Sequence, residues 1–295
     1  PERCRNQAEL LGFFDLPIEV LQSSAALERV AAELVDDLAA DGITYAEIRW
    51  APRLHLQRGL SVDAVMGAVA AGVARATSRL GSDAPLVVLI VTAMRSHPPA
   101  ANAELARTAG AFGLPIVGFD LAGPEAEWPA PPHAVAFVAA REAGLRLTAH
   151  AGEVPSAEHV REVLAFGVER VAHGVSAAAD AGLVDHLRDR GITLDLCPTS
   201  NVQAGVVPSL AEHPLARLHR AGVSVTISTD DLTVTGTTLS AEMARTAAGQ
   251  GLSPGELADV AVNAFERAFA PRSIVAPRLA EARTAWAAWR SSSIN

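Results

Sequence analysis

The stretch Leu145-Arg146-Leu147-Thr148-Ala149-His150-Ala151-Gly152-Glu153 decides how the rest of the chain is interpreted. Its apolar first half predicts a buried strand that ends at His150, and the small Ala151-Gly152 pair allows a sharp turn. The turn leaves Glu153 close to His150. A metal ligand beside a carboxylic acid suits hydrolysis at a ring carbon, because one polarises water and the other donates a proton. A lone histidine at a strand end is, however, more often a structural or surface group.

The same pattern of a short apolar run, a polar or glycine-rich turn and an alanine-rich amphipathic stretch recurs along the chain. The apolar runs predict strands over residues 43–49, 86–92, 116–120, 145–150, 170–173, 193–196 and 223–228. The amphipathic stretches predict helices over residues 25–40, 62–79, 100–111, 134–143, 157–166, 177–190, 215–221, 238–250, 254–269 and 277–290. Strict alternation of this kind predicts an α/β protein with a parallel sheet covered by helices.

Two architectures fit this alternation, an open doubly wound sheet and a closed barrel. Chemically capable residues follow strand after strand, which favours the barrel, since its active site is assembled from the carboxyl ends of many strands. A doubly wound sheet would concentrate them at one switch point. A barrel of this type has eight strands, and the sequence predicts seven. We therefore expect a single (β/α)8 TIM-type barrel domain over residues 1–295 whose first strand is missing from this chain.

Composition narrows the possible functions. Apolar residues make up 49% of the 295 positions, and the formal net charge of −9 disfavours binding to nucleic acid. The chain contains no lysine, which excludes Schiff-base chemistry and a carbamylated-lysine metal bridge. It has only two cysteines, no secretory signal and no apolar run long enough for a membrane span. We expect a cytoplasmic protein without a nucleic acid or membrane partner; no expectation for its oligomeric state follows.

Four further strand ends carry polar or glycine-containing motifs. Adjacent carboxylates at Asp230 and Asp231 repel each other unless a cation or a hydrogen-bond donor lies near them, although a helix N-cap at Asp230 would explain that motif equally well. His173 closes another strand and precedes a glycine. The other two are the segments 118–125, whose glycines can bring backbone N–H groups close to a ligand, and 197–203. The occurrence of such motifs at five strand ends of one chain is poorly explained by coincidence.

The motifs together resemble the adenosine deaminase family of the amidohydrolase superfamily. They are His150-Ala-Gly-Glu153, Arg170-Val-Ala-His173-Gly, Cys197-Pro-Thr-Ser-Asn-Val-Gln203, Ser228-Thr-Asp-Asp231, Tyr45-Ala-Glu-Ile-Arg-Trp-Ala-Pro52 and Gly118-Phe-Asp-Leu-Ala-Gly-Pro-Glu125. The resemblance runs from about residue 20 to the C-terminal helices. It implies an amidohydrolase barrel and a purine nucleoside aminohydrolase that deaminates adenosine or 2′-deoxyadenosine to the inosine form with release of ammonia.

The resemblance also implies roles for individual residues. His150 and Asp230 would bind one Zn²⁺ ion per site. Glu153 would protonate the purine ring nitrogen next to the attacked carbon. His173 would orient the attacking water and help to remove its proton, assisted by Asp230. Asp231 would bond to the imidazole ring of the purine.

The backbone N–H of Gly123 would meet the opposite ring nitrogen of the purine. The family also has a His-x-His pair at the end of its first strand, and this chain has none. We therefore expect two further zinc-binding histidines upstream of Pro1. Cys197 is expected to be a buried strand residue, and no role is assigned to the other seven histidines, which we expect in loops or on helix surfaces (His55, His97, His133, His159, His186, His213 and His219).

Other functions remain open at this point. Within the enzyme class, the substrate could be adenine, aminodeoxyfutalosine or another small 6-aminopurine. Outside it, the chain could be a non-catalytic barrel that has lost its metal site. The absence of His-x-His motivates the second alternative, whereas the joint presence of Glu153, His173, Asp230 and Asp231 opposes it.

Overall fold

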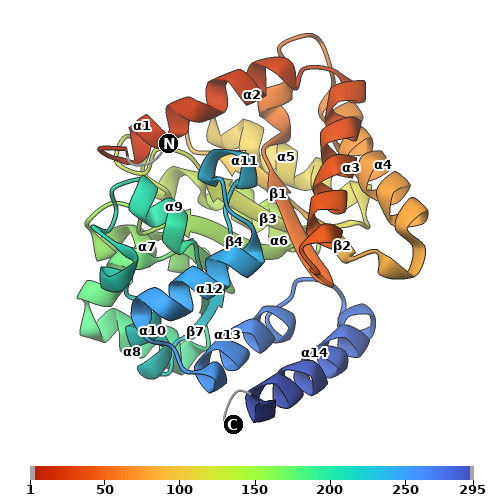
Figure 1. Ribbon diagram of the computed structural model, residues 1–295. Helices are drawn as coiled ribbons and strands as arrows, with labels where there is room; N and C mark the ends of the chain where they lie inside the picture. Colours follow the sequence, from red (N-terminus) through yellow and green to blue (C-terminus); the bar gives the residue numbers. More distant parts are fainter. Residues whose placement is uncertain (1–3, 293–295) are drawn as a thin grey trace. The chain divides into compact units, whose positions relative to one another are not determined.

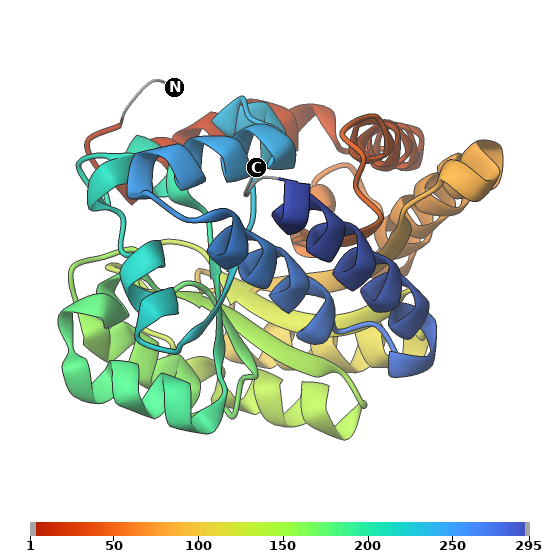
Figure 2. The same cartoon turned by 60° about the horizontal axis from the view of Figure 1, so that its bottom comes forward.

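The protein is described by a computed structural model, drawn in Figures 1 and 2, and the description below concerns residues 4–292. These residues form two compact units. The first unit is Leu11–Thr148, and the second consists of residues 4–10 and 149–292. Both units are built from parallel strands and helices, so the predicted α/β class is confirmed. That residues 1–295 form a single domain stays a prediction.

The first unit is built on a parallel sheet whose strands follow one another in chain order. A doubly wound sheet would instead reverse its order at a switch point. The strands are β1 (Tyr45–Trp50), β2 (Leu86–Met94), β3 (Ile116–Ala122) and the start of β4 (Arg146–Ala151). The helices are α2 (Asp15–Val20), α3 (Ser24–Ala40), α4 (Val62–Leu80), α5 (Pro99–Phe112) and α6 (Ala134–Glu142), while α1 (Gln7–Leu11) precedes α2.

Local chemistry explains where these elements begin. Ser23 and Ser61 are N-caps whose hydroxyl groups accept hydrogen bonds from the first turns of α3 and α4. Strand β2 is apolar along nearly its whole length and is buried except at its two ends, as expected for a strand covered on both faces. Figure 1 shows α3 and α4 side by side.

The second unit continues from the end of β4, and its strands also lie parallel in chain order. They are β5 (Arg170–His173), β6 (Thr193–Leu196) and β7 (Ser224–Ile227). The helices are α7 (Ala157–Leu164), α8 (Ala181–Arg190), α9 (Pro198–Gln203), α10 (Leu215–Arg220), α11 (Leu232–Thr235), α12 (Leu239–Gln250), α13 (Pro254–Glu266) and α14 (Arg272–Ser292). Helix α13 packs against α14 (Figure 2).

A buried ion pair joins β5 to β6. The guanidinium Nε of Arg170 lies 3.2 Å from Oδ2 of Asp195, and both side chains are less than a tenth exposed. Thr226 of β7 donates a hydrogen bond to the same carboxylate, and the guanidinium lies over the ring of Phe269. The pair is therefore satisfied on several sides, which a buried charge requires. Neither Arg170 nor Asp195 is among the predicted site residues, so we interpret the pair as structural.

The strands predicted from the sequence are confirmed, with ends displaced by at most a few residues. Two helix predictions were wrong in detail. The helix expected over 177–190 is divided into a 3-10 turn, Val175–Ala179, and α8, because Asp180 caps the start of α8. The helix expected to begin at Pro277 begins at Arg272, with the proline inside it. Between residues 4 and 44 the structure contains helices and no strand.

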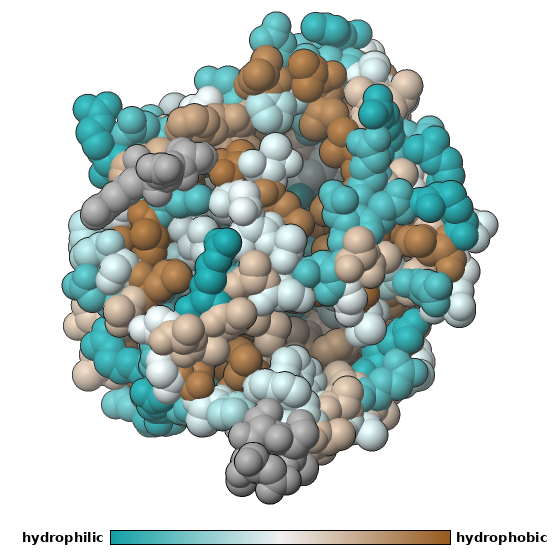
Figure 3. Space-filling model, viewed as in Figure 1, coloured by the Kyte–Doolittle hydropathy of each residue, from teal (hydrophilic) through white to brown (hydrophobic). Residues whose placement is uncertain are grey.

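Within the described residues, no helix combines the length and apolar character that crossing a membrane requires. Some large apolar side chains are nevertheless exposed, among them Phe13 (50%), Leu16 (67%) and Leu114 (62%). Figure 3 shows apolar residues interspersed with hydrophilic ones on one face. Scattered apolar exposure of this kind is normal for a folded protein surface.

The contact between α3 and α4 depends on Gly72. A Cβ atom at this position would overlap the carbonyl oxygen of Glu28 and lie 2.9 Å from Cβ of Ala31. We expect Gly72→Ala to lower the free energy of unfolding by about 1–3 kcal/mol, since the two helices must move apart. Gly67 on the same helix has open space around its Cβ position, so Gly67→Ala should raise the free energy of unfolding by about 0.5–1 kcal/mol. Urea denaturation of the two variants measures both effects, and equal stabilities would contradict this account of the packing.

Candidate active site

The turns that follow β4 and β5 pack backbone against backbone. The N–H of Gly174 donates to the carbonyl of Ala151 over 2.8 Å, and the N–H of Ser176 donates to the carbonyl of Gly152 over 3.0 Å. Gly152 has a φ of +85°, and a Cβ there would lie 3.0 Å from the backbone of Gly174. Only glycine fits this close approach, which brings the residues after the two strands together.

Two residues of the site, His173 and Asp230, adopt a left-handed backbone conformation. Their φ values are +65° and +59°, and they are the only non-glycine residues with positive φ in the described part of the chain. Such a conformation costs on the order of 1–2 kcal/mol for an L-residue and is concentrated at functional sites.

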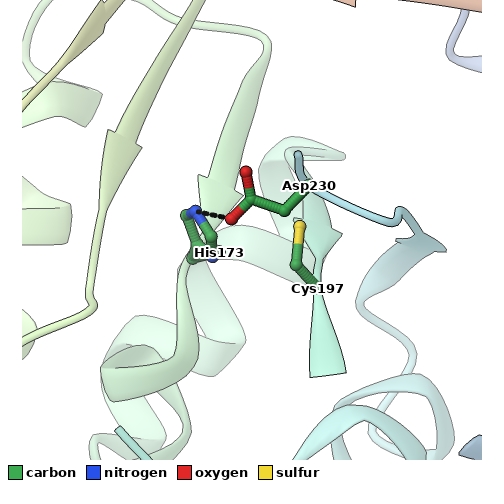
Figure 4. Close-up of side chains that lie close together, drawn as sticks. All are labelled: His173, Cys197 and Asp230. Carbon is green, nitrogen blue, oxygen red and sulfur yellow. Dashed lines mark ion pairs between the residues drawn. The ribbon is translucent and has the colours of Figure 1, made fainter. Parts of the chain in front are cut away.

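His173 lies between two carboxylates. Its Nε2 atom is 3.6 Å from Oε1 of Glu153 and 3.9 Å from Oδ2 of Asp230. The side chains of His173 and Glu153 are 3% and 8% exposed, whereas that of Asp230 is 29% exposed. Figure 4 shows the imidazole of His173 facing the Asp230 carboxylate across this gap. The predicted residues from β4, β5 and β7 therefore lie together in the second unit.

The carboxylate of Asp230 is held in its charged form. The hydroxyl of Ser200 donates to Oδ2 over 2.7 Å, and the backbone N–H of Asp231 donates to Oδ1 over 2.8 Å. Burial acts to raise the pKa of Asp230, but the neighbouring His173, the Ser200 hydroxyl and His150 outweigh it and hold that pKa below its ordinary value. An ionised carboxylate can bind a cation or accept a proton.

Glu153 receives a hydrogen bond from a residue far away in the sequence. The side-chain amide of Gln7 donates to Oε2 of Glu153 over 2.7 Å, and Gln7 is 9% exposed. The backbone N–H of Cys4 bonds to the carbonyl of Gln203, which holds the segment before α1 against α9. One oxygen of Glu153 is thus fixed by Gln7, while the other faces His173.

Asp231 is the N-cap of α11. Its Oδ1 accepts a hydrogen bond from the backbone N–H of Val234 over 2.8 Å. The alternative of a helix cap in this motif therefore applies to Asp231, not to Asp230 as expected. Burial is the main cause that raises the pKa of Asp231, and the charge of Asp230 adds to it. The cap occupies one oxygen of Asp231.

Gly123 lies in the first unit, at the end of β3. Its φ is +114°, and a Cβ there would lie 3.3 Å from Cε of Met94. The N–H of Arg95 donates to the carbonyl of Ala122, which fixes the chain just before the glycine. The backbone at this strand end therefore favours a glycine, and the predicted contact of its N–H with a ligand stays a prediction.

The second unit contains donors that suit a transition metal. His150 lies beside His173, with 5.3 Å between the ring centroids, and it contributes to lowering the pKa of Asp230. The side chains of His173, Cys197 and Asp230 offer ligand atoms that all lie within 4.8 Å of one another (Figure 4). Imidazole nitrogen, carboxylate oxygen and thiolate are the ligands that Zn²⁺ takes in proteins. Of the donors in this region, the imidazole of His150 and the carboxylate of Asp230 are of the kind that fits a zinc ion.

Cys197 is buried as predicted, at 5% exposure, directly after β6. Three of the seven histidines that were expected in loops or on helix surfaces are buried. His55, His133 and His213 are 6%, 3% and 3% exposed. Each is buried because it hydrogen-bonds to partners at hand, such as the carbonyl of Leu21 for His55.

Several residues around the site were not singled out from the sequence. They are Gln7, Ser200, Asn201 and His213. Ser200 and Asn201 belong to a quoted motif, and their position directly after a buried strand was the signal for them. Gln7 and His213 have no local signal, because their contacts join segments that are distant in the sequence.

Comparison with known proteins places these observations in a family. The family model for adenosine deaminase matches residues 2–280. An adenosine deaminase from Mycobacteroides abscessus is 42% identical over 279 residues, which span 89% of this chain and 76% of the relative.

Solved structures agree. An adenine deaminase from Arthrobacter aurescens superposes with a TM-score of 0.89 at 28% identity, covering 97% of this chain and 86% of the other. Arabidopsis ADAL in complex with IMP gives a TM-score of 0.86 at 25% identity, with 98% and 84% of the two chains covered. The likeness confirms the predicted TIM-type barrel of the amidohydrolase kind. The chain belongs to the adenosine deaminase family.

Proposed function

We propose that the protein catalyses the zinc-dependent hydrolytic deamination of adenosine or 2′-deoxyadenosine. The observation that carries the proposal is the placement of His173 between Glu153 and Asp230, with His150 beside it. An acid, a base and metal donors within one small region are what addition of water to an aromatic ring carbon requires. The names of relatives about 40% identical to the chain support adenosine over other purines.

The residues proposed to bind the metal are His150 and Asp230. Zinc sites use three or four protein ligands, so these two residues would form part of the ligand set. A zinc ion held there would supply the Lewis acidity that makes water a nucleophile near neutral pH. Cys197 approaches the same region but donates its thiol hydrogen weakly to the carbonyl of Asp195, so we assign it no ligand role.

Proton transfers are assigned to the two carboxyl groups. As the water oxygen bonds to the amino-bearing carbon, one water proton passes to Asp230 and Glu153 protonates the adjacent ring nitrogen. Asp230 then returns its proton to the amino group. The carbon–nitrogen bond breaks with the electron pair leaving on ammonia, and the remaining hydroxyl proton restores the acid form of Glu153. The amide of Gln7 orients Glu153 during both transfers.

Recognition of the purine is proposed for Asp231 and Gly123. The oxygen of Asp231 that does not cap α11 would bond to the imidazole ring of the base, and the N–H of Gly123 would meet the opposite ring nitrogen. The small-molecule substrate and the cytoplasmic location expected from the sequence remain proposals. Adenine is the second candidate substrate, because the superposed Arthrobacter aurescens protein is named an adenine deaminase.

Removing the proton donor should abolish turnover without unfolding the protein. We expect Glu153→Gln in the full-length protein to lower kcat for adenosine by about 10²–10⁴-fold, the usual contribution of a positioned acid. Conversion to inosine is followed by ultraviolet absorbance and by ammonia release. Glu158→Gln is the matched control, because Glu158 lies five residues further along with a side chain that is 70% exposed, and its activity should equal that of the wild type.

Adenine and aminodeoxyfutalosine are assayed alongside adenosine. A wild-type protein that turned over adenine but not adenosine would replace the proposed substrate. No turnover of any 6-aminopurine by the zinc-loaded wild type would favour the non-catalytic barrel instead.

Metal removal gives an independent measurement. We expect the full-length protein to contain about one zinc ion per chain, and dialysis against a chelator should abolish activity until zinc is restored. His150→Ala should lower the zinc content well below one ion per chain by elemental mass spectrometry. The control His186→Ala changes an exposed histidine of α8 and should keep its zinc. Full zinc occupancy in His150→Ala would remove His150 from the ligand set.

A further inference from the structure

A chain of hydrogen bonds leads from the backbone of α10 to His173. Its first group is a backbone N–H, which can act only as a donor. The backbone N–H of Leu215 donates to Nδ1 of His213 over 3.3 Å. A backbone N–H can only donate, so Nδ1 of His213 carries no proton. Burial lowers the pKa of His213 to about 3, so the ring is neutral at ordinary pH. The single ring proton of His213 must therefore sit on Nε2.

The next link is Asn201, which is fully buried. Nε2 of His213 lies 3.1 Å from Oδ1 of Asn201, and an N–H there requires the acceptor end of the amide to face it. The orientation of the Asn201 amide therefore follows from the position of the His213 proton on Nε2. Its NH₂ group must then point in the opposite direction.

The NH₂ group of Asn201 reaches His173. Its Nδ2 atom lies 3.0 Å from Nδ1 of His173, and an amide NH₂ can only donate. Nδ1 of His173 is therefore an acceptor without a proton. When the His173 ring carries a single proton, that proton therefore sits on Nε2, the atom that points into the gap between Glu153 and Asp230.

Helix α9 also positions the partner of His173. Ser200, the neighbour of Asn201, donates to Asp230, so one helical turn holds both groups. Glu242 of α12 holds that turn in place. It is 1% exposed and accepts hydrogen bonds from the backbone N–H and the hydroxyl of Thr199. The hydrogen bonds to His173 and Asp230 thus come from a fixed support.

We propose that His213 and Asn201 are positioning residues that hold His173 in the tautomer with its proton on Nε2. His173 then donates a hydrogen bond to the reacting oxygen and cannot take the proton of the attacking water, which passes to Asp230. The inference rests on the proposed deamination for its kinetic consequence, but the tautomer itself does not depend on that function. It replaces the sequence-based expectation that His173 helps to remove the proton of the water.

The tautomer is measured directly by nuclear magnetic resonance. In the full-length protein with ¹⁵N-labelled histidine, the protonated and bare ring nitrogens of His173 give well-separated shifts, and loss of signals in His173→Gln assigns them. We expect Nε2 protonated and Nδ1 bare in the wild type. In Asn201→Asp, a carboxylate that can only accept replaces the amide, and the proton should move to Nδ1 of His173. A wild-type His173 with its proton on Nδ1 would overturn the inference.

The kinetics of three variants test whether the hydrogen bond from His173 to the reacting oxygen contributes to turnover. Asn201→Asp should lower kcat by about 10²–10³-fold while KM changes by less than about threefold, because a donor to the reacting oxygen is misplaced and substrate contacts remain. His213→Phe, which removes the donor to Asn201, should give a similar loss. His213→Gln offers an amide donor in place of Nε2–H and should recover most of the activity. The exposed-surface control His186→Gln should match the wild type.

Zinc content and melting temperature accompany each variant, so loss of metal or of the fold is separated from a tautomer change. Wild-type kcat in a folded, zinc-loaded Asn201→Asp variant would contradict the role of the relay, as would equal losses in His213→Gln and His213→Phe. If the wild type turns over no 6-aminopurine, the proposed function fails, and the nitrogen shifts of His173 still decide the tautomer.

Discussion

The arrangement of the candidate site depends on one backbone contact, the hydrogen bond from the N–H of Gly174 to the carbonyl of Ala151. It brings the turn after β4 against the turn after β5 at a distance that admits no side chain at Gly152. His150 lies near the end of β4 and Glu153 in the turn after it, whereas His173 is the last residue of β5. Without this contact the three side chains would belong to separate loops, and neither the metal donors nor the proton donor would face His173.

Much of the fold was predictable because the pattern that encodes it is local. Each strand is a short apolar run and each long helix an amphipathic stretch with a capping residue, so both are visible within a few residues of sequence. The short helices α9 and α11 were not visible in this way. They follow buried strands as single turns, held by contacts such as those of Thr199 with Glu242 that no local pattern contains.

The residues of the site also fall into those with a local sequence signal and those that only tertiary contacts bring there. Glu153, His173 and Asp230 stand at strand ends, where a barrel gathers its functional groups, and the structure brings them together. Gln7 bonds to Glu153, which is 146 residues further along the chain. His213 bonds to Asn201, which is 12 residues earlier in the chain. The sequence offered Asp230 as a helix cap, whereas the structure uses one oxygen of Asp231 for the cap. Sequence thus indicates which groups do the chemistry, and tertiary contacts decide how each one is oriented.

The left-handed backbone at His173 and Asp230 has a consequence for engineering and for natural drift. Glycine would relieve the conformational cost at both positions. The residue with the least backbone strain there is therefore one that has no functional group. Selection for thermal stability alone would therefore favour glycine there and erase the site while improving the scaffold. A histidine and an aspartate at two such positions are therefore explained by the chemistry of their side chains and not by the stability of the backbone.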